Sequence, residues 1–189
     1  LELVYFGRLV PRKGVAHCIE AIRLARARGV DCRLTVIGQG PDREHLKALA
    51  AEMRASVRFL DALPYGPELF AAVDRAQVLL AAPLSEDTPR SALDAMARGL
   101  AVVAYDIAYY QYLADASGAV VTAPFNDPAG LALAITKLAR DRVRLAGCMR
   151  SAREFAADNT QDIWMDRRFR WLDKYCGVVS LQAADPARR

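Results

Sequence analysis

The residues best suited to chemistry lie in a short loop that follows the first apolar run of the chain. Gly7 and Gly14 frame this loop, which carries the cations Arg8, Arg12 and Lys13. Glycine lets a backbone come close to a ligand, and guanidinium and ammonium groups complement the charge of a phosphate. From local composition, an anion-binding loop and a surface loop with solvated cations are about equally well supported.

A second candidate segment, residues 83–96, combines two carboxylates with a predicted helix start. Glu86 falls in the loop and Asp94 in the helix, roughly 7–8 Å along the helix axis at ~1.5 Å per residue. The free N–H groups and the positive dipole end of a helix N-terminus can hold an anion. Carboxylates on either side could then accept hydrogen bonds from hydroxyl groups that flank a bound phosphate. Composition alone slightly favours the competing interpretation, a capped helix with Asp94 on its solvated face.

The remaining polar motifs are weaker. Residues 38–41, Gly-Gln-Gly-Pro, form a glycine turn that enters a predicted helix, but they lack the third glycine of a dinucleotide fingerprint and are not a Walker A loop. His17 and His45 lie on predicted helices outside these loops, and we expect both to be exposed to solvent. The four cysteines have neither CxxC spacing nor a histidine at zinc-ligand spacing, which indicates thiols in a reducing compartment.

The elements that must position these loops alternate between strands and helices. Short apolar runs predict strands at 3–6, 34–37, 57–60, 78–80, 101–105 and 119–122. Apolar spacing and Gly or Pro at the ends predict helices at 15–28, 40–54, 67–73, 89–98 and 127–140, followed by two arginine-rich helices within 141–175. This order predicts the α/β class, with a doubly wound, Rossmann-like parallel sheet of about six strands and C-terminal helices. Right-handed crossovers would bring every strand-to-helix loop to one edge of the sheet, where a ligand should bind.

Length and composition favour one domain. The 189 residues are 53% hydrophobic and carry a formal net charge of +4, which is compatible with an anionic ligand. We expect one domain over residues 1–175 and a disordered tail over 176–189. No apolar run approaches the ~18 residues of a membrane span and no signal-like start is seen, so we expect a cytoplasmic location. The chain opens directly in a strand pattern, and we expect it to be a fragment of a longer protein.

Four stretches, in this order along the chain, resemble the signatures of one family. They are YFGRLVPRKG, LTVIGQGP, VRFLDAL and LSEDTPRSALDAMARGLAVVAYD, the last being similar to a signature with two Glu eight positions apart. Over roughly residues 2–175 the chain resembles the C-terminal domain of family 4 (group 1) retaining glycosyltransferases, which have the two-domain GT-B architecture. Each stretch alone is a weak indication of the family, whereas four stretches in the same order are a fairly specific one.

The resemblance implies a nucleotide-sugar donor and a catalytic set of three residues. Arg8 and Lys13 match the family's Arg/Lys pair, which would bind the donor diphosphate and neutralise it as it leaves. Glu86 matches the first acidic residue of the last signature, which would contact hydroxyl groups of the transferred sugar.

The same resemblance implies further donor contacts. Asp94 would hold the ribose hydroxyls, backbone N–H groups near Arg90 and Ser91 would face the distal phosphate, and the 60–63 loop would border the base. The whole predicted donor-binding set is Gly7, Arg8, Lys13, Gly38, Leu60, Leu63, Glu86, Arg90, Ser91 and Asp94.

The implied activity is that of a hexosyltransferase. The domain would bind a UDP-, GDP- or ADP-sugar, and the whole protein would transfer the hexose with retention to an acceptor hydroxyl. No cofactor or metal ion is implied, because cations and a helix terminus can neutralise the diphosphate. The acceptor site would lie on the protein's own N-terminal domain, outside this chain, so we expect the fragment alone to be inactive. Peripheral association of the full-length protein with a membrane is compatible with this assignment, and nucleic acid is not an expected partner.

Several residues depart from the family pattern. Asp94 replaces a usual Glu, and Asp87 stands where Gly is preferred, which adds a negative charge beside the phosphates. The other departures are Asp61, Ala101, Tyr109 and Tyr110, the two tyrosines in a predicted loop where glycines are frequent.

These departures keep other interpretations open. One is a non-catalytic, transferase-like or partner-binding Rossmann-like module. Another, a flavodoxin or receiver-type domain, fits the strand order but lacks an early acidic cluster and leaves the 7–14 loop unexplained. The sugar, the nucleotide, the acceptor and the oligomeric state are left open by the sequence.

Overall fold

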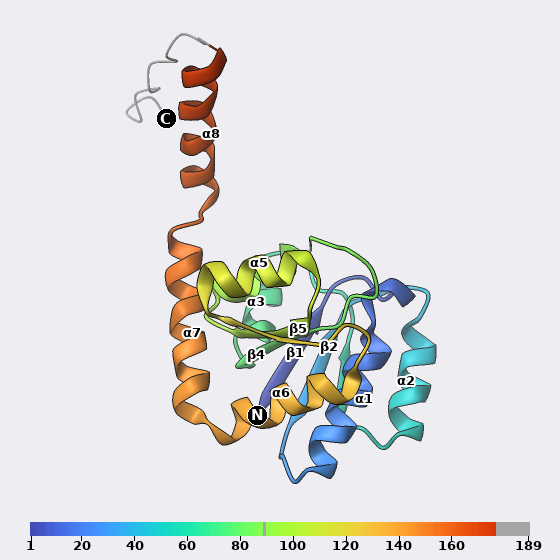
Figure 1. Cartoon of the computed structure of the whole chain (residues 1–189). Coiled ribbons are helices and arrows are strands. Elements are labelled where there is room, and N and C mark those ends of the chain that lie inside the picture. Colours follow the sequence, from blue (N-terminus) through green and yellow to red (C-terminus); the bar gives the residue numbers. More distant parts are fainter. Residues whose placement is uncertain (89, 177–189) are drawn as a thin grey trace. The chain divides into compact units, whose positions relative to one another are not determined.

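The centre of the protein is a sheet of six parallel strands, in the order β3-β2-β1-β4-β5-β6 (Figure 1). This computed structural model describes residues 1–88 and 90–176. The strands are β1 (Glu2–Phe6), β2 (Arg33–Ile37), β3 (Val57–Leu60), β4 (Val78–Ala81), β5 (Ala101–Tyr105) and β6 (Val120–Ala123). Every neighbouring pair is parallel. The predicted doubly wound, Rossmann-like α/β fold is therefore confirmed.

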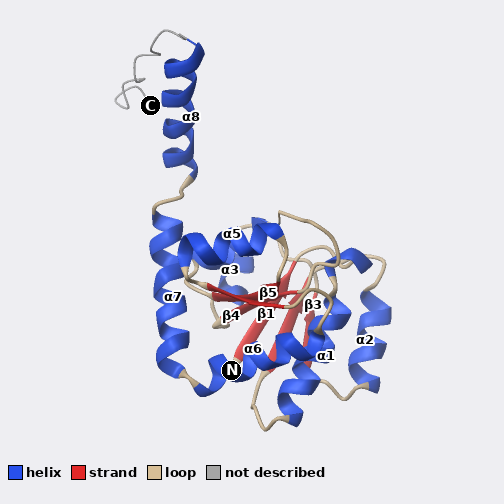
Figure 2. Ribbon diagram, viewed as in Figure 1, coloured by secondary structure: helices blue, strands red, loops and turns tan. Residues whose placement is uncertain are grey.

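Helices cover both faces of the sheet (Figure 2). One face carries α1 (Val15–Ala27), α2 (Arg43–Glu52) and α6 (Pro128–Arg140), and the other carries α3 (Pro67–Val73), α4 (Arg90–Ala97) and α5 (Ala108–Ser117). Because successive strand residues point to opposite faces, Leu3 packs in the first core and Val4 in the second. All residues of β4 and β5 are buried, which explains why these strands appear in the sequence as continuous apolar runs.

Helix α5 is absent from the sequence prediction, which placed Tyr109 and Tyr110 in a loop. That placement is wrong, since both residues lie in the first turn of α5. Ile107 precedes the helix in an extended conformation, and Gly118 ends it in the left-handed conformation at φ 67°. Tyr110 and Leu113, three residues apart on one helix face, are both buried in the second core.

The two expected C-terminal helices are present as α7 (Arg142–Ala157) and α8 (Gln161–Cys176). The chain divides into two compact units, Leu1–Ala156 and Ala157–Arg189. This division lies before the expected domain end at residue 175, because α7 buries side chains such as Leu145 whereas α8 contains no buried residue. Apart from Cys176, the predicted tail 176–189 lies outside the described residues. Within the described part of the chain, no helix is both long enough and apolar enough to cross a membrane.

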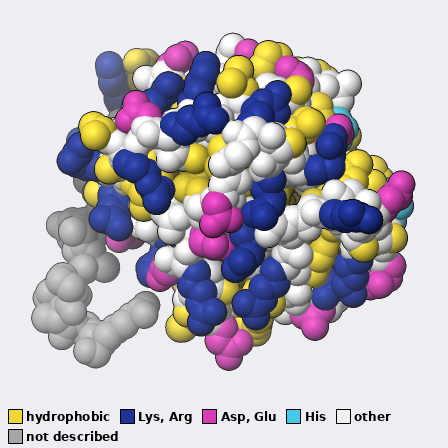
Figure 3. All heavy atoms as spheres, turned by 90° about the horizontal axis from the view of Figure 1, so that it is seen from below, with side chains coloured by type: hydrophobic (Ala, Val, Ile, Leu, Met, Phe, Trp, Pro, Cys, Tyr) yellow, Lys and Arg dark blue, Asp and Glu magenta, His cyan; other side chains and the backbone are white. Residues whose placement is uncertain are grey.

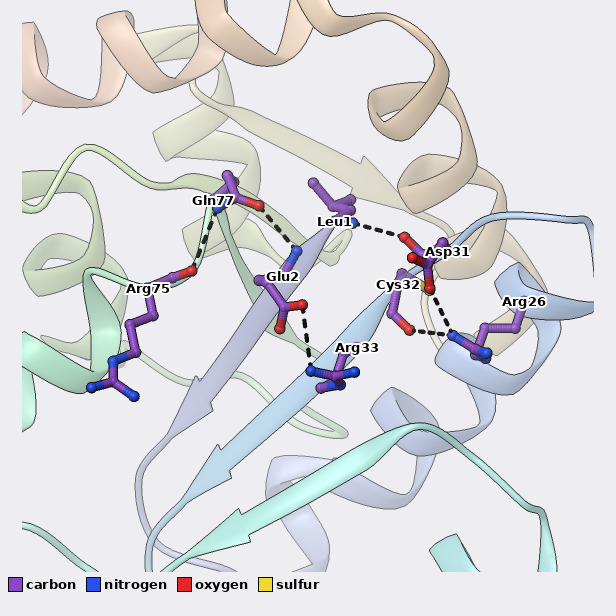
Figure 4. Close-up of polar contacts among 8 residues, drawn as sticks. All are labelled: Leu1, Glu2, Arg26, Asp31, Cys32, Arg33, Arg75 and Gln77. Atoms are coloured by element: carbon purple, nitrogen blue, oxygen red, sulfur yellow. Dashed lines mark hydrogen bonds and ion pairs between the residues drawn. The ribbon is translucent and has the colours of Figure 1, made fainter.

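Polar contacts tie the strands together at their amino ends (Figure 4). The backbone N–H of Glu2 in β1 donates to the side-chain oxygen of Gln77, just before β4, at 3.0 Å. The Glu2 carboxylate also lies 3.9 Å from Arg33 at the start of β2, and Arg26 donates to Asp31 at 3.2 Å. Seen from below, the molecule carries many Lys and Arg side chains with carboxylates among them (Figure 3). The amino edge therefore aligns the strands, and the glycine-rich loops lie at the opposite, carboxyl edge.

Candidate functional site

The strand order reverses between β1 and β4, whose neighbours β2 and β5 lie on opposite sides of the pair. Ligands of open parallel sheets bind beyond the carboxyl ends of the strands at such a switch point. A cavity of about 400 Å³ lies there. Its lining comes from the end of β1, the loops after β1, β3 and β4, and helices α3, α4 and α5. The residues are Tyr5, Phe6, Gly7, Arg8, Arg12, Lys13, Tyr65, Leu69, Pro83, Asp87, Arg90, Ser91, Asp94 and Tyr110.

A second cavity, of about 350 Å³, adjoins the first. The two share Phe6, Gly7, Arg8, Tyr65 and Leu69, and the second is completed by Ile37, Gly38, Gln39, Ala62 and Leu63. For the described residues, the predicted convergence of the 7–14, 38–41, 61–65 and 85–91 loops on one edge is confirmed. One compartment has charged walls and the other mainly apolar walls, which suits a ligand with an anionic part and a flat, apolar part.

Two glycines let these loops approach each other. Gly14 is left-handed at φ 63°, and a Cβ there would lie 1.8 Å from the carbonyl oxygen of Ala82. A Cβ on Gly38 would lie 2.0 Å from the carbonyl oxygen of Gly7. Only glycine fits such close approaches, so the loop after β1 is held between the loops after β2 and β4.

An ion pair between Lys13 and Asp87 joins the loops after β1 and β4 inside the larger cavity. Both side chains are about one-sixth exposed, and Arg12 lies 3.6 Å from the same carboxylate. The other Asp87 oxygen accepts from the backbone N–H of Thr88 at 3.0 Å. Within the described residues, the exposed guanidinium of Arg8 makes no ion pair, so it is available to a ligand.

The two carboxylates of the predicted site lie in different surroundings. Asp94 lines the larger cavity and accepts a hydrogen bond from the Tyr65 hydroxyl at 2.9 Å. Glu86 lines neither cavity, and its carboxylate accepts from the backbone N–H of Ala108, at the start of α5, at 3.4 Å. The two carboxylates therefore have different partners, and of the two Asp94 lines the larger cavity.

The larger cavity brings together the predicted residues Gly7, Arg8, Lys13, Arg90, Ser91 and Asp94, and the second cavity adds Gly38 and Leu63. Glu86 and Leu60 line neither. The Leu60 carbonyl is engaged by the N–H of Gly38 at 3.3 Å, and its side chain packs against the second core. The roles assigned to these residues stay predictions.

Three tyrosines, Tyr5, Tyr65 and Tyr110, line the larger cavity but are absent from the predicted donor-binding set. Burial raises the pKa of Tyr5 and, well above its usual value, that of Tyr110. The hydrogen bond to Asp94 raises the pKa of the exposed Tyr65. All three phenols are therefore neutral hydrogen-bond donors at physiological pH. The one available signal was position, since Tyr5 lies one residue before the end of β1 and Tyr65 lies in the loop after β3.

His17 departs from its expected exposure, because it is half-buried and its Nδ1 lies 2.8 Å from the Tyr105 hydroxyl. His45 is exposed, as expected. Burial raises the pKa of the Cys18 thiol to about 12, which makes it a core residue and not a nucleophile.

Comparison with known proteins decides the family. The family described as Glycosyl transferases group 1 matches residues 1–141. The chain belongs to this family. Among its relatives, 2-deoxystreptamine glucosyltransferase of Streptomyces kanamyceticus is 30% identical over 159 residues, covering 82% of this chain and 40% of that protein. Phosphatidyl-myo-inositol mannosyltransferase of Mycolicibacterium smegmatis is 31% identical over 155 residues, covering 80% and 39%. The chain thus spans about two fifths of the length of these curated relatives.

Solved structures share the fold of this group 1 glycosyltransferase domain. The catalytic domain of cholesterol-alpha-glucosyltransferase from Helicobacter pylori superposes with a TM-score of 0.74 at 19% identity, covering 84% of this chain and 98% of that one. Anabaena Alr3699/HepE in complex with UDP superposes with a TM-score of 0.76 at 20% identity, covering 92% of this chain and 48% of that one. WaaG, a glycosyltransferase involved in lipopolysaccharide biosynthesis, superposes with a TM-score of 0.70 at 27% identity, covering 93% of this chain and 47% of that one. The predicted family and its GT-B-type fold are confirmed.

The chemistry available to this glycosyltransferase domain is the neutralisation of an anion. Arg8, Arg12 and Lys13 and the start of α4 surround one cavity, where a phosphate group would meet cations and free backbone N–H groups. Across residues 1–88 and 90–176, no group of three His, Cys, Asp or Glu side chains is placed to hold a metal ion. Independence from metal stays a prediction.

Proposed function

We propose that this domain binds a nucleotide-sugar donor, with the diphosphate in the larger cavity. The observation that carries the proposal is the meeting of Arg8, Lys13 and the N-terminal end of α4 in that cavity. Charge-assisted hydrogen bonds and a helix dipole are the groups that hold a diphosphate and stabilise it as a leaving group. The protein's part in the reaction is thus electrostatic.

The nucleoside would extend into the adjoining cavity. Asp94 lies beside the wall shared by the two cavities, next to Tyr65, where it can accept hydrogen bonds from ribose hydroxyls. The apolar walls of the second cavity, including Leu63, suit the flat face of a base. Solved relatives of the same fold were crystallised with UDP, which supports a nucleoside diphosphate at this edge.

The sugar would extend the other way, toward Glu86 and the start of α5. The proposed reaction is transfer of a hexose, with retention, from a UDP-, GDP- or ADP-sugar to an acceptor hydroxyl. The two named relatives are a glucosyltransferase and a mannosyltransferase, so a hexose is the expected group. We assign the acceptor site to an N-terminal domain outside this chain. We further propose that the whole protein is cytoplasmic and that its reaction needs no metal ion. Peripheral association of the whole protein with a membrane is compatible with these assignments.

A second function has one specific observation in its favour. The Lys13–Asp87 ion pair places a carboxylate where a phosphate would otherwise bind, as expected for a non-catalytic, transferase-like module. Donor binding by the domain and sugar transfer by the full-length protein would separate these functions.

The test is a calorimetric panel of UDP, GDP, ADP and their hexose conjugates, with uridine, guanosine and adenosine as matched phosphate-free controls. One nucleoside diphosphate should bind, and its phosphate-free nucleoside should bind far more weakly. A ligand that binds only the folded state adds about 2.7 kcal/mol of stability at 100 Kd, so a thermal shift gives an independent readout. Equal binding of nucleoside and diphosphate, or binding of neither, would contradict the assignment.

A further inference from the structure

A buried tyrosine hydroxyl without a partner lies against the larger cavity. Tyr110 is the third residue of α5, is 0% exposed and lines the cavity together with Lys13 and Asp87. Among the residues that the structure describes, its hydroxyl has no hydrogen-bond partner. Buried polar groups are nearly always paired, because an unpaired one lowers the stability of the fold, so this hydroxyl calls for an explanation.

Two other buried tyrosines at the same edge show the ordinary arrangement. The Tyr5 hydroxyl donates to the carbonyl of Arg8 at 3.0 Å, and the Tyr105 hydroxyl lies 2.8 Å from Nδ1 of His17. Tyr105 is 0% exposed like Tyr110 but lines neither cavity. Of these three tyrosines, Tyr5 and Tyr110 line the larger cavity. The Tyr5 hydroxyl has a partner within the protein, whereas the Tyr110 hydroxyl has none among the described residues.

The chemistry of this hydroxyl favours an anionic acceptor. Burial, followed by the neighbouring Tyr109 and Asp87, raises the pKa of Tyr110 well above its usual value. The phenol is therefore protonated and can donate. Tyr110 lines the same cavity as Lys13 and Asp87, whose side chains form an ion pair there. A phosphate group that replaces that carboxylate beside Lys13 would bring oxygen acceptors to the same position.

We propose that the Tyr110 hydroxyl is a donor-binding group, which donates a hydrogen bond to an oxygen of the diphosphate when the nucleotide sugar replaces Asp87 at Lys13. This inference rests on the proposed nucleotide-sugar binding and adds a residue to it. The unpaired hydroxyl destabilises the free domain, and the ligand relieves that cost on binding. Affinity is thereby gained without a further positive charge in the cavity.

The test compares Tyr110→Phe with Tyr105→Phe, a matched pair in which each variant loses one buried hydroxyl. Calorimetry with UDP, GDP, ADP, inorganic pyrophosphate and the matching nucleotide sugar measures affinity, and thermal unfolding measures the stability of the free domain. For Tyr110→Phe we expect about 10-fold weaker binding of the nucleoside diphosphate and of pyrophosphate, with an unchanged or slightly higher melting temperature. For Tyr105→Phe we expect the reverse, namely unchanged affinity and a melting temperature lower by about 2–4 °C.

Each other outcome overturns the proposal in a distinct way. Unchanged diphosphate affinity of Tyr110→Phe, while the wild type binds, would remove Tyr110 from the site and leave the proposed function intact. Weaker binding of the nucleotide sugar alone would move the contact from the diphosphate to the sugar. A destabilised Tyr110→Phe variant would show that the hydroxyl has a structural partner. Failure of the wild type to bind any of the probes would overturn the proposed function as well.

Discussion

Asp87 is the residue at which the free domain and its proposed donor compete for the same cation. Its carboxylate pairs with Lys13 and lies 3.6 Å from Arg12. A diphosphate must displace this carboxylate to reach Lys13, and any carboxylate left nearby repels it. The ion pair is therefore expected to hold the cavity walls together and to lower the affinity of the cavity for an anion.

Replacing Asp87 by Asn should separate these two effects. Asn keeps an oxygen that can accept from Thr88, but it loses the charge that holds Lys13. We expect about 10-fold tighter binding of the nucleoside diphosphate, equivalent to ~1.4 kcal/mol, and a loss of about 1 kcal/mol in the free energy of unfolding. Calorimetry at low and at physiological ionic strength gives the first quantity, and urea unfolding gives the second.

The control is Asp74→Asn, which removes a carboxylate paired with Arg98 outside both cavities. It should lower stability by a similar amount and leave nucleotide affinity unchanged. Weaker binding by Asp87→Asn would show that Asp87 assists the ligand, through a bridging group, and does not compete with it.

The acidic pair allows a second residue-scale prediction, because its two members lie in different surroundings. Asp94→Asn should weaken the binding of the nucleoside diphosphate and of the nucleotide sugar alike, since both ligands contain ribose. Glu86→Gln should weaken only the binding of the nucleotide sugar, because Glu86 lines neither cavity and is proposed to contact the transferred sugar. The expected cost is ~1–3 kcal/mol in each affected complex, measured by calorimetry. Equal weakening of both ligands by Glu86→Gln would contradict its assignment.

At the scale of elements, the loop after β1 depends on a turn that only glycine can make. Gly14→Ala would place a Cβ 1.8 Å from the Ala82 carbonyl in a left-handed residue, so the loop or β4 must move. Gly29→Ala is the matched control, since Gly29 is also left-handed, at φ 79°, but a Cβ there meets nothing within 4 Å. We expect Gly29→Ala to cost about 1 kcal/mol of unfolding free energy. Gly14→Ala should cost about 3 kcal/mol or more and also weaken diphosphate binding. Equal costs in urea unfolding would show that the contact with Ala82 relaxes freely.

The same scale shows what the sequence could and could not predict. Strands such as β5 were predictable because burial on both faces requires a continuous apolar run, and the loop after β1 was predictable because glycines and cations identify it. Helix α5 was not, since its first turn is rich in tyrosine and begins without a capping side chain. Tyr110 could not be assigned either, because the sequence placed it in a loop and gave no sign that its side chain would be buried. Its proposed role follows only from the fold, which leaves its hydroxyl unpaired and makes Tyr110 part of the same cavity wall as Lys13 and Asp87.

At the scale of the whole molecule, the proposed donor site belongs to one of the two compact units. Every residue that lines the two cavities lies within Leu1–Ala156, and α8 of the second unit buries no residue. Removal of residues 160–189 should therefore leave the nucleoside diphosphate affinity and the melting temperature of the first unit nearly unchanged. Removal of residues 141–189 is the control, because it also deletes α7, whose Leu145 and Cys148 pack into the first core. That deletion should lower the melting temperature strongly, since each large buried apolar side chain contributes ~1.5–3 kcal/mol. If the shorter deletion abolished binding while the first unit stayed folded, the donor site would need α8, and the domain would extend to residue 175 as the sequence predicts.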